Sequence, residues 1–267
     1  MSRLDTVMAR WLRQDVQGMH AYAVQDSTGM IKLDAMENPF RLPPALQQAL
    51  GERLGAVAIN RYPGARIDTL REALARHAGL PEGRALMLGN GSDELISLLA
   101  MACDVPGATI VAPLPSFVMY QMSAQLQGLK FVGVPLTADF ELDEAAMLAA
   151  LEAHQPALLY IAYPNNPTAN LFDDRIVERL IEAAPGLVII DEAYQPFASR
   201  SYIDRLARHE HVLLMRTMSK FGLAGVRIGY MMGAARLITQ IDEVRPPYNV
   251  RVLKAEAALF GLEHAEE

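Results

Sequence analysis

The stretch VLLMRTMSKFGLAGVRIGYMMG, residues 212–233, decides the fold. Its two ends, VLLMRT at 212–217 and RIGYMMG at 227–233, are short and almost continuously apolar. Runs of this kind are typical of strands that are buried on both faces of a mostly parallel sheet. Between them lies a Gly-rich loop that begins with Lys220. The stretch contains no G-x-G-x-x-G, which argues against a dinucleotide-binding fingerprint.

The same alternation runs back along the chain to about residue 68. We expect short apolar strands at 85–88, 108–112, 130–136, 157–163 and 187–191. We expect helices at 44–54, 69–78, 92–102, 116–127, 143–153 and 173–183. Strands that alternate with amphipathic helices predict an α/β fold, with a mostly parallel central sheet sandwiched by helices.

The composition is that of an ordinary globular protein. The 267 residues are 51% hydrophobic and 21% charged, which suggests one large or two small domains. A net charge of −7 does not favour nucleic acid or an anionic membrane as a partner. Cys103 is the only cysteine, and the first residues show no signal peptide, so we expect a cytoplasmic protein. The sequence contains no run of about 18 apolar residues, so we expect no membrane span.

Polar groups follow the predicted strands at the edge where open parallel sheets bind ligands. The sequence GNGSDE at 89–94 opens a helix, whose N-terminal N–H groups can hold a phosphate. Ser92 or Asp93 can equally be a plain helix cap, and the cap is the simpler interpretation of this motif alone. The motif is not a Walker A loop, because no Gly-Lys-Ser/Thr follows it.

Three further strand ends carry candidate groups. The sequence PNNPT at 164–168, taken alone, is a turn. Asp191 is costly to bury without a partner, and it fits a helix cap, a metal ligand or the partner of a protonated heterocycle nitrogen. No His, Cys, Asp or Glu cluster at ligand spacing accompanies it, so we expect no metal. Lys220, flanked by hydroxyl side chains and followed by Arg227, suits a phosphate ester, and a desolvated lysine near positive charge becomes a nucleophile.

Taken together and in this order, these motifs resemble the fold-type I aminotransferases that depend on pyridoxal 5'-phosphate (PLP). Within that class the chain is most similar to the histidinol-phosphate aminotransferases. The matching stretches are LDAMENPF (33–40), NRYPGAR (60–66), GNGSDELISLL (89–99), PSFVMY (115–120), YPNNPT (163–168), VIIDEAYQPF (188–197), RTMSKFGLAGVRIGY (216–230) and RPPYNV (245–250). One departure is Ala169, where many relatives have glycine.

The resemblance implies PLP as the cofactor and Lys220, Asp191 and Tyr194 as catalytic residues. Lys220 would form the Schiff base with PLP and move a proton between the substrate Cα and the cofactor C4'. Asp191 would keep the pyridine nitrogen protonated. Asn166 and Tyr194 would hydrogen-bond the phenolic oxygen, and Tyr120 would stack on the ring face.

The resemblance also implies a phosphate site, a dimer and a reaction. The phosphate would be held by the backbone N–H groups of Ser92 and Asp93, the hydroxyls of Thr217 and Ser219, and Arg227. Tyr62 would reach the cofactor phosphate of a neighbouring subunit, which implies a homodimer; otherwise Tyr62 is an exposed turn tyrosine. Tyr22 and Asn38 would line the substrate pocket.

The implied reaction is transamination of histidinol phosphate with 2-oxoglutarate, a step in histidine biosynthesis. Threonine-phosphate decarboxylase and other fold-type I aminotransferases share these motifs and stay open as alternatives. A regulator domain without activity is not favoured, because this acidic chain leaves no room before residue 30 for a DNA-binding domain.

We expect three parts: an N-terminal arm with part of a small domain (1–66), a large PLP-binding α/β domain (67–248) and the start of a helix toward the rest of the small domain (249–267). The resemblance implies that relatives continue for roughly another ninety residues. Those residues carry the arginine that binds the substrate carboxylate. We therefore expect this chain alone to be inactive, with Val252, Leu253, Leu259 and Phe260 exposed on an unfinished helix.

Overall fold

A computed structural model describes residues 2–19 and 26–267 of the chain. It divides into two compact units, Met1–Met36 and Glu37–Glu267. The first unit contains α1 (Arg3–Trp11) and α2 (Gln14–Gln17), and a capping box between Ser2 and Asp5 starts α1. In the described part of the chain, no helix has the length and apolar character needed to cross a membrane.

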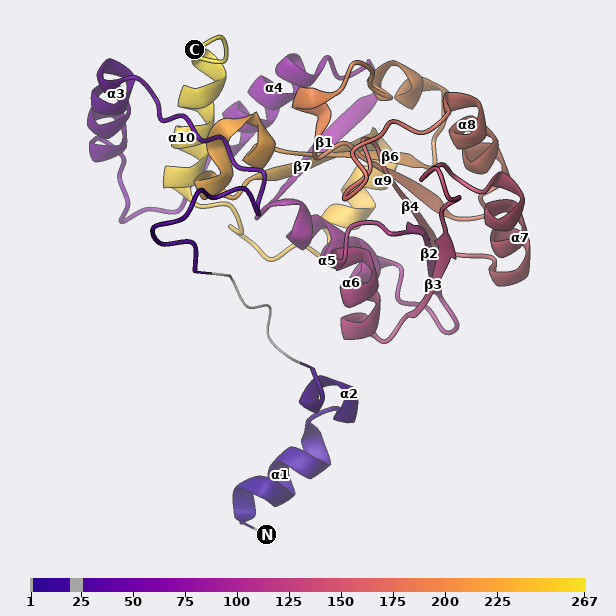
Figure 1. The fold of residues 1–267 in the computed structure, drawn as a ribbon. Helices are drawn as coiled ribbons and strands as arrows, with labels where there is room; N and C mark the ends of the chain where they lie inside the picture. The colour runs from indigo at the N-terminus through magenta and orange to yellow at the C-terminus, as the bar shows by residue number, and fades with distance from the viewer. Residues whose placement is uncertain (1, 20–25) are drawn as a thin grey trace. The chain divides into compact units, whose positions relative to one another are not determined.

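The second unit is built on a seven-stranded sheet with the order β1-β7-β6-β5-β4-β2-β3 (Figure 1). The strands are β1 (Arg84–Gly89), β2 (Thr109–Leu114), β3 (Lys130–Pro135), β4 (Leu158–Ala162), β5 (Leu187–Asp191), β6 (Val212–Thr217) and β7 (Gly229–Ala234). Strand β7 runs antiparallel to both of its neighbours, whereas the pairs from β3 to β6 are parallel. The predicted α/β fold with a mostly parallel sheet is confirmed.

Helices cover both faces of this sheet and bury two apolar cores. The helices are α3 (Pro44–Gly55), α4 (Arg66–Ala78), α5 (Ser92–Ala102), α6 (Met119–Gln127), α7 (Glu144–His154), α8 (Asp174–Ala183), α9 (Ala235–Asp242) and α10 (Val252–Glu263). Side chains of α5, α6 and α9 share one core with Tyr160 of β4, and those of α4, α7, α8 and α10 share the other with Ile161. Both strand residues are fully buried, and a buried side chain of this size contributes roughly 1.5–3 kcal/mol.

Two helices differ from the sequence expectation. The helix expected at 116–127 begins only at Met119, because Asn165 holds the preceding residues in a loop. Its Nδ2 donates to the Pro115 carbonyl at 3.1 Å, and the Ser116 hydroxyl donates to its Oδ1, also at 3.1 Å. Helix α9 was not predicted, although its buried Ile238 and Ile241 have the helical spacing that would have indicated it.

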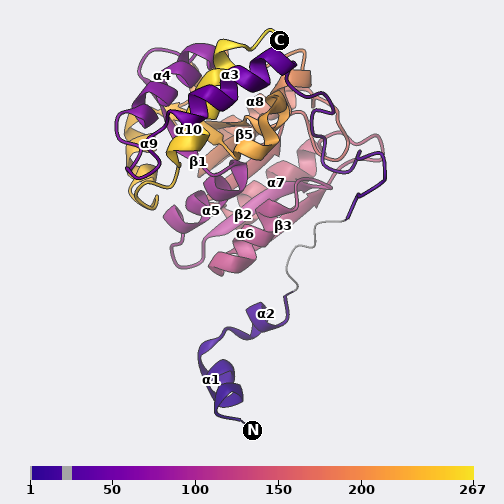
Figure 2. The same ribbon diagram turned by 90° about the vertical axis from the view of Figure 1, so that its left-hand side faces the viewer.

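On α10, Leu253 is 42% exposed, as expected, and Val252 is half-buried. The expected exposure of Leu259 and Phe260 is wrong. Each is 4% exposed, because α10 packs against α4 and α3, as Figure 2 shows. Glu256 of α10 strengthens this contact through ion pairs with Arg53 and Arg66, the latter with an Nη2–Oε1 distance of 2.6 Å. These arginines hold the pKa of Glu256 down at about 2.

Candidate active site

Strand register brings the polar strand ends to one edge of the sheet. Gly229, the first residue of β7, is the register partner of both Gly89 at the end of β1 and Thr217 at the end of β6. Asp191 at the end of β5 is paired with Ala162 at the end of β4. The motifs that follow these strands therefore meet, as expected for ligand sites beyond the carboxyl ends of parallel strands.

One end of this site is a tight cradle around the first turn of α5. Gly91 has φ of 81°, which favours glycine, and Arg227 Nη2 lies 2.8 Å from where a Cβ on Gly91 would sit. A Cβ on Gly229 would lie 2.6 Å from the backbone nitrogen of Ser92. The first N–H groups of a helix have no partner within it, so this backbone can face an anion.

Arg227 and two hydroxyls border the same cradle. Its guanidinium donates to Ser219 Oγ at 3.2 Å and to Asp93 Oδ2 at 3.1 Å. The Oγ atom of Ser219 lies 3.0 Å from Thr217 Oγ1. Arg227 also has φ of 53°, a left-handed conformation that costs a non-glycine residue about 1–3 kcal/mol and is typical of functional sites. The structure thus brings together the residues expected to bind phosphate.

The other end of the site is a buried carboxyl group. Asp191 is 3% exposed and accepts hydrogen bonds from the Tyr120 hydroxyl at 2.7 Å and from the Ala193 backbone N–H at 3.0 Å. Burial raises its pKa to about 6, although both hydrogen bonds act in the opposite direction. The carboxyl group is therefore poised to gain or lose a proton near neutral pH.

The position of Tyr120 corrects the expected stacking on a cofactor ring. Tyr120 is 1% exposed, its ring is stacked on Tyr160 with centroids 4.3 Å apart, and its hydroxyl is bound to Asp191. A ring with so little exposure has no open face to offer. Phe117, from the same PSFVMY stretch, is only half-buried and meets Tyr120 edge-on, with ring centroids 5.7 Å apart. The motif PSFVMY holds two aromatic residues, so the sequence offered Phe117 as a second candidate for the stacking position.

Lys220 and Tyr194 lie together between the two ends. The Lys220 Nζ atom lies 5.3 Å from the centre of the Tyr194 ring, within reach of a cation–π interaction. Tyr194 is half-buried, and burial, followed by the charge of Asp191, raises its pKa. Lys220 follows Ser219 directly in the chain, so the lysine is close to the phosphate cradle as well.

The two asparagines after β4 have different positions. Asn166 is half-buried at the strand end, where it was expected. Asn165 is 2% exposed and is bound to Ser116, Pro115 and Thr168, the last with an Nδ2–Oγ1 distance of 2.7 Å. Sequence reasoning missed this structural role of Asn165, which holds the Asn166 loop against the loop before α6.

Of the remaining candidates, the structure describes Tyr62 and Asn38, whereas Tyr22 lies outside the described residues. Tyr62 is 76% exposed, and its ring is stacked on Tyr248 with centroids 4.3 Å apart. Asn38 packs against Gly222, where a Cβ would lie 3.2 Å from Asn38 Nδ2. Gly222 is two residues from Lys220, so Asn38 contacts the loop that carries the lysine.

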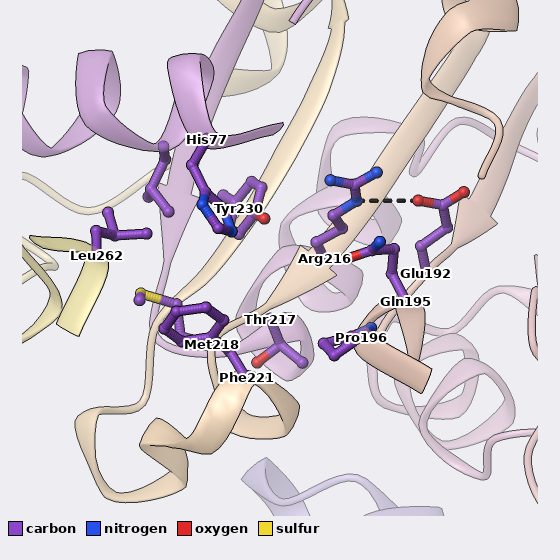
Figure 3. Close-up of a pocket in the computed structure, with 11 residues that line it drawn as sticks. His77, Glu192, Gln195, Pro196, Arg216, Thr217, Met218, Phe221, Tyr230 and Leu262 are labelled. Atoms are coloured by element: carbon purple, nitrogen blue, oxygen red, sulfur yellow. Dashed lines mark hydrogen bonds and ion pairs between the residues drawn. The ribbon is translucent and has the colours of Figure 1, made fainter. Parts of the chain in front are cut away.

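A small cavity lies behind these strand ends and is lined by a buried ion pair (Figure 3). Glu192 and Arg216 are joined by an Oε2–Nε distance of 2.9 Å, and they link the ends of β5 and β6. Burial and the charge of Arg216 lower the pKa of the neighbouring His77. With a volume of about 20 Å³, the cavity has room for one water molecule and is too small for a cofactor.

Comparison with known proteins defines the class. The chain belongs to the aminotransferase class I and II family, whose model matches residues 28–267. The histidinol-phosphate aminotransferase of Methylibium petroleiphilum is 75% identical over 263 residues, which cover 97% of this chain and 71% of that protein. The histidinol-phosphate aminotransferase of Polaromonas naphthalenivorans is 68% identical over 99% of this chain and 73% of its own length.

A solved structure is similar as well. The histidinol-phosphate aminotransferase of Sinorhizobium meliloti, in complex with pyridoxal-5'-phosphate, has a TM-score of 0.77 and 27% identity. The match covers 87% of this chain and 64% of that one. A cradle for a phosphate at one end and a buried carboxyl group at the other fit a cofactor of that kind, with a phosphate and a ring nitrogen.

Proposed function

We propose that this chain is a histidinol-phosphate aminotransferase that uses PLP and 2-oxoglutarate, in the biosynthesis of histidine. The observation that carries the proposal is the meeting of Asp191, Lys220 and the Arg227 cradle at one sheet edge. The relative that is 75% identical and bears this enzyme's name supports the choice of substrate. When bound, PLP supplies an electron sink for the charge released at the substrate Cα.

The residues of the chain have separable tasks in this proposal. The α5 backbone, Ser219 and Arg227 bind the cofactor phosphate. Asp191 holds a proton on the ring nitrogen, and Tyr120 fixes the Asp191 carboxylate for that task. Lys220 attaches the cofactor and transfers the proton at the substrate Cα.

Several finer assignments are part of the same proposal. Asn166 and Tyr194 bind the phenolic oxygen, and Phe117 takes the ring-stacking role once expected of Tyr120. Tyr62, exposed in this chain, reaches the phosphate of a second copy, so the working enzyme is a homodimer. We further propose a cytoplasmic location. The division of the chain at residues 66 and 248 stays a prediction.

The proposal is tested in two steps. First, the 267-residue chain is titrated with PLP, and covalent attachment is followed by absorbance. Second, turnover is measured in this chain and in a chimera that adds the part of the Methylibium relative beyond the match. We expect glutamate to form from histidinol phosphate in the chimera. Release of carbon dioxide from threonine phosphate, without glutamate, would favour the decarboxylase instead, and failure to bind PLP would contradict both.

A further inference from the structure

The loop that opens α5 is held by polar contacts that the functions above do not use. The Asn90 backbone N–H donates to Glu94 Oε2 at 2.7 Å, and Asn90 Nδ2 donates to Glu94 Oε1 at 3.1 Å. The same Nδ2 donates to the Asn249 carbonyl at 3.0 Å. Asn249 Nδ2 donates to Glu94 Oε2 at 2.7 Å. The conformation of the cradle thus depends on the segment that follows α9.

Lys254 of α10 completes this network. Its Nζ donates to Asn90 Oδ1 at 2.6 Å, so the amide oxygen and the amide nitrogen of Asn90 are both engaged. The contact joins residues far apart in sequence, at positions 90 and 254. Gly91 and Ser92 follow Asn90 directly, so a fixed Asn90 fixes the backbone that begins α5.

The charge of Lys254 also acts at this end of the site. Lys254 is half-buried, and burial lowers its pKa, followed by the charges of Arg251 and Arg227. Lys254 is therefore close enough to Arg227 for the two cations to repel each other. The groups that face it are these two arginines, Glu94 and Asn90. An anion placed between cations of this kind relieves their repulsion.

We propose that Lys254 is a positioning residue for the cofactor phosphate, acting through Asn90 on the backbone of Gly91 and Ser92. The proposal rests on the proposed function, since it assumes that this cradle binds a phosphate. A backbone held in place before binding loses less entropy when the anion arrives. The contribution of Lys254 should therefore be confined to ligands that carry the phosphate.

The test compares PLP with pyridoxal, which has the same ring without the phosphate. Dissociation constants for both are measured with the parent chain, with Lys254→Met and with the control Arg251→Met. The control removes the same charge three residues earlier, from an exposed side chain with no hydrogen bond to Asn90 among those described. For Lys254→Met we expect about a tenfold weaker affinity for PLP, because a charge-assisted hydrogen bond is lost. Pyridoxal affinity should stay unchanged, and Arg251→Met should lose less than about threefold.

Each other result has a definite meaning. Equal losses for PLP and pyridoxal in Lys254→Met would show a purely structural role and overturn the inference. If Lys254→Met binds PLP as tightly as the parent chain does, the role of Lys254 is overturned as well, whereas the proposed phosphate site is not affected. A parent chain that binds PLP no better than pyridoxal would remove the proposed phosphate site and, with it, this role of Lys254.

Discussion

The two ends of the site use different physics. At the end with the buried carboxyl group, Asp191 is 3% exposed, and burial is the main cause that raises its pKa from an ordinary 3.8 to about 6. At the phosphate end, the Arg227 side chain is 46% exposed and forms an ion pair with a similarly exposed Asp93. In the proposed function, the proton is therefore controlled where water is excluded, and the phosphate is bound where charges remain accessible and can be screened by salt.

Lys220 lies next to Ser219 of the phosphate cradle and close to Tyr194, so we expect its removal to lower turnover the most. In the chimera with the Methylibium relative, Lys220→Ala should abolish turnover, because the covalent attachment and the proton transfer are both lost. PLP should still bind through the Arg227 cradle, and equilibrium dialysis measures this retained binding. Mutant protein that keeps a lysine-linked chromophore after borohydride reduction would contradict the assignment.

Asp191→Asn tests the buried end. Introduced into the same chimera, it should lower turnover by orders of magnitude, since an amide cannot hold the ring-nitrogen proton. A rate within a factor of about three of the unsubstituted chimera would contradict this. The pKa of Asp191 is raised on folding, so ionising the buried group costs stability as the pH rises through about 6.

The same variant therefore has a pH signature without cofactor. The free energy of unfolding of Asp191→Asn, relative to that of the parent, should rise between pH 4 and 6, because only the parent must ionise a buried carboxyl group. Above pH 6 the difference should stay at about 2–3 kcal/mol. Urea unfolding at several pH values measures the difference. A stability difference that does not change with pH would show that burial does not set the pKa of this carboxyl group.

Arg227→Gln tests the accessible end. The affinity for PLP should fall by about tenfold to a hundredfold, because the phosphate loses its charged partner. At about 1 M salt, screening should narrow the difference in PLP affinity between Arg227→Gln and the parent. The loss of turnover caused by Asp191→Asn should persist at the same salt concentration, because Asp191 is buried. If the Arg227→Gln effect does not change with salt, the two ends do not differ as described.

Tyr120→Phe should give the smallest effect of these substitutions. The ionised Asp191 loses a donor, so its pKa should rise further above about 6. Carbon-13 NMR of the aspartate carboxyl groups in the cofactor-free protein follows this titration. Tyr160→Phe is the matched control, because the buried Tyr160 hydroxyl has no hydrogen-bond partner in the described part of the chain. Equal shifts in both variants would assign the effect to packing.

Much of the fold could be predicted from the sequence, because buried parallel strands contain continuously apolar runs such as LVII at 187–190. The antiparallel direction of β7 could not, since the pattern of RIGYMMG fits either direction. The site motifs were recognisable because each follows a strand. The buried position of Tyr120 could not be predicted, because the choice between Tyr120 and Phe117 as the ring-stacking residue depends on which ring packs against Tyr160.

The contacts of α10 were also beyond local pattern. Glu256 and Lys254 are polar residues on a helix, which sequence alone assigns to a solvated face. Their partners, Arg53 and Arg66 for Glu256 and Asn90 for Lys254, lie more than 150 positions away. Long-range pairing of this kind follows from the fold and could not be read before the fold was known.

Covalent attachment of PLP to Lys220 can be tested directly on this chain. The chain has four lysines, at positions 32, 130, 220 and 254, so the attachment point can be mapped without ambiguity. The parent chain is mixed with PLP, reduced with borohydride, digested and analysed by mass spectrometry. We expect the pyridoxyl label on the peptide that contains Lys220 and on no other in stoichiometric amount. A stoichiometric label on Lys254, the other lysine near the phosphate cradle, or no label at all, would contradict it.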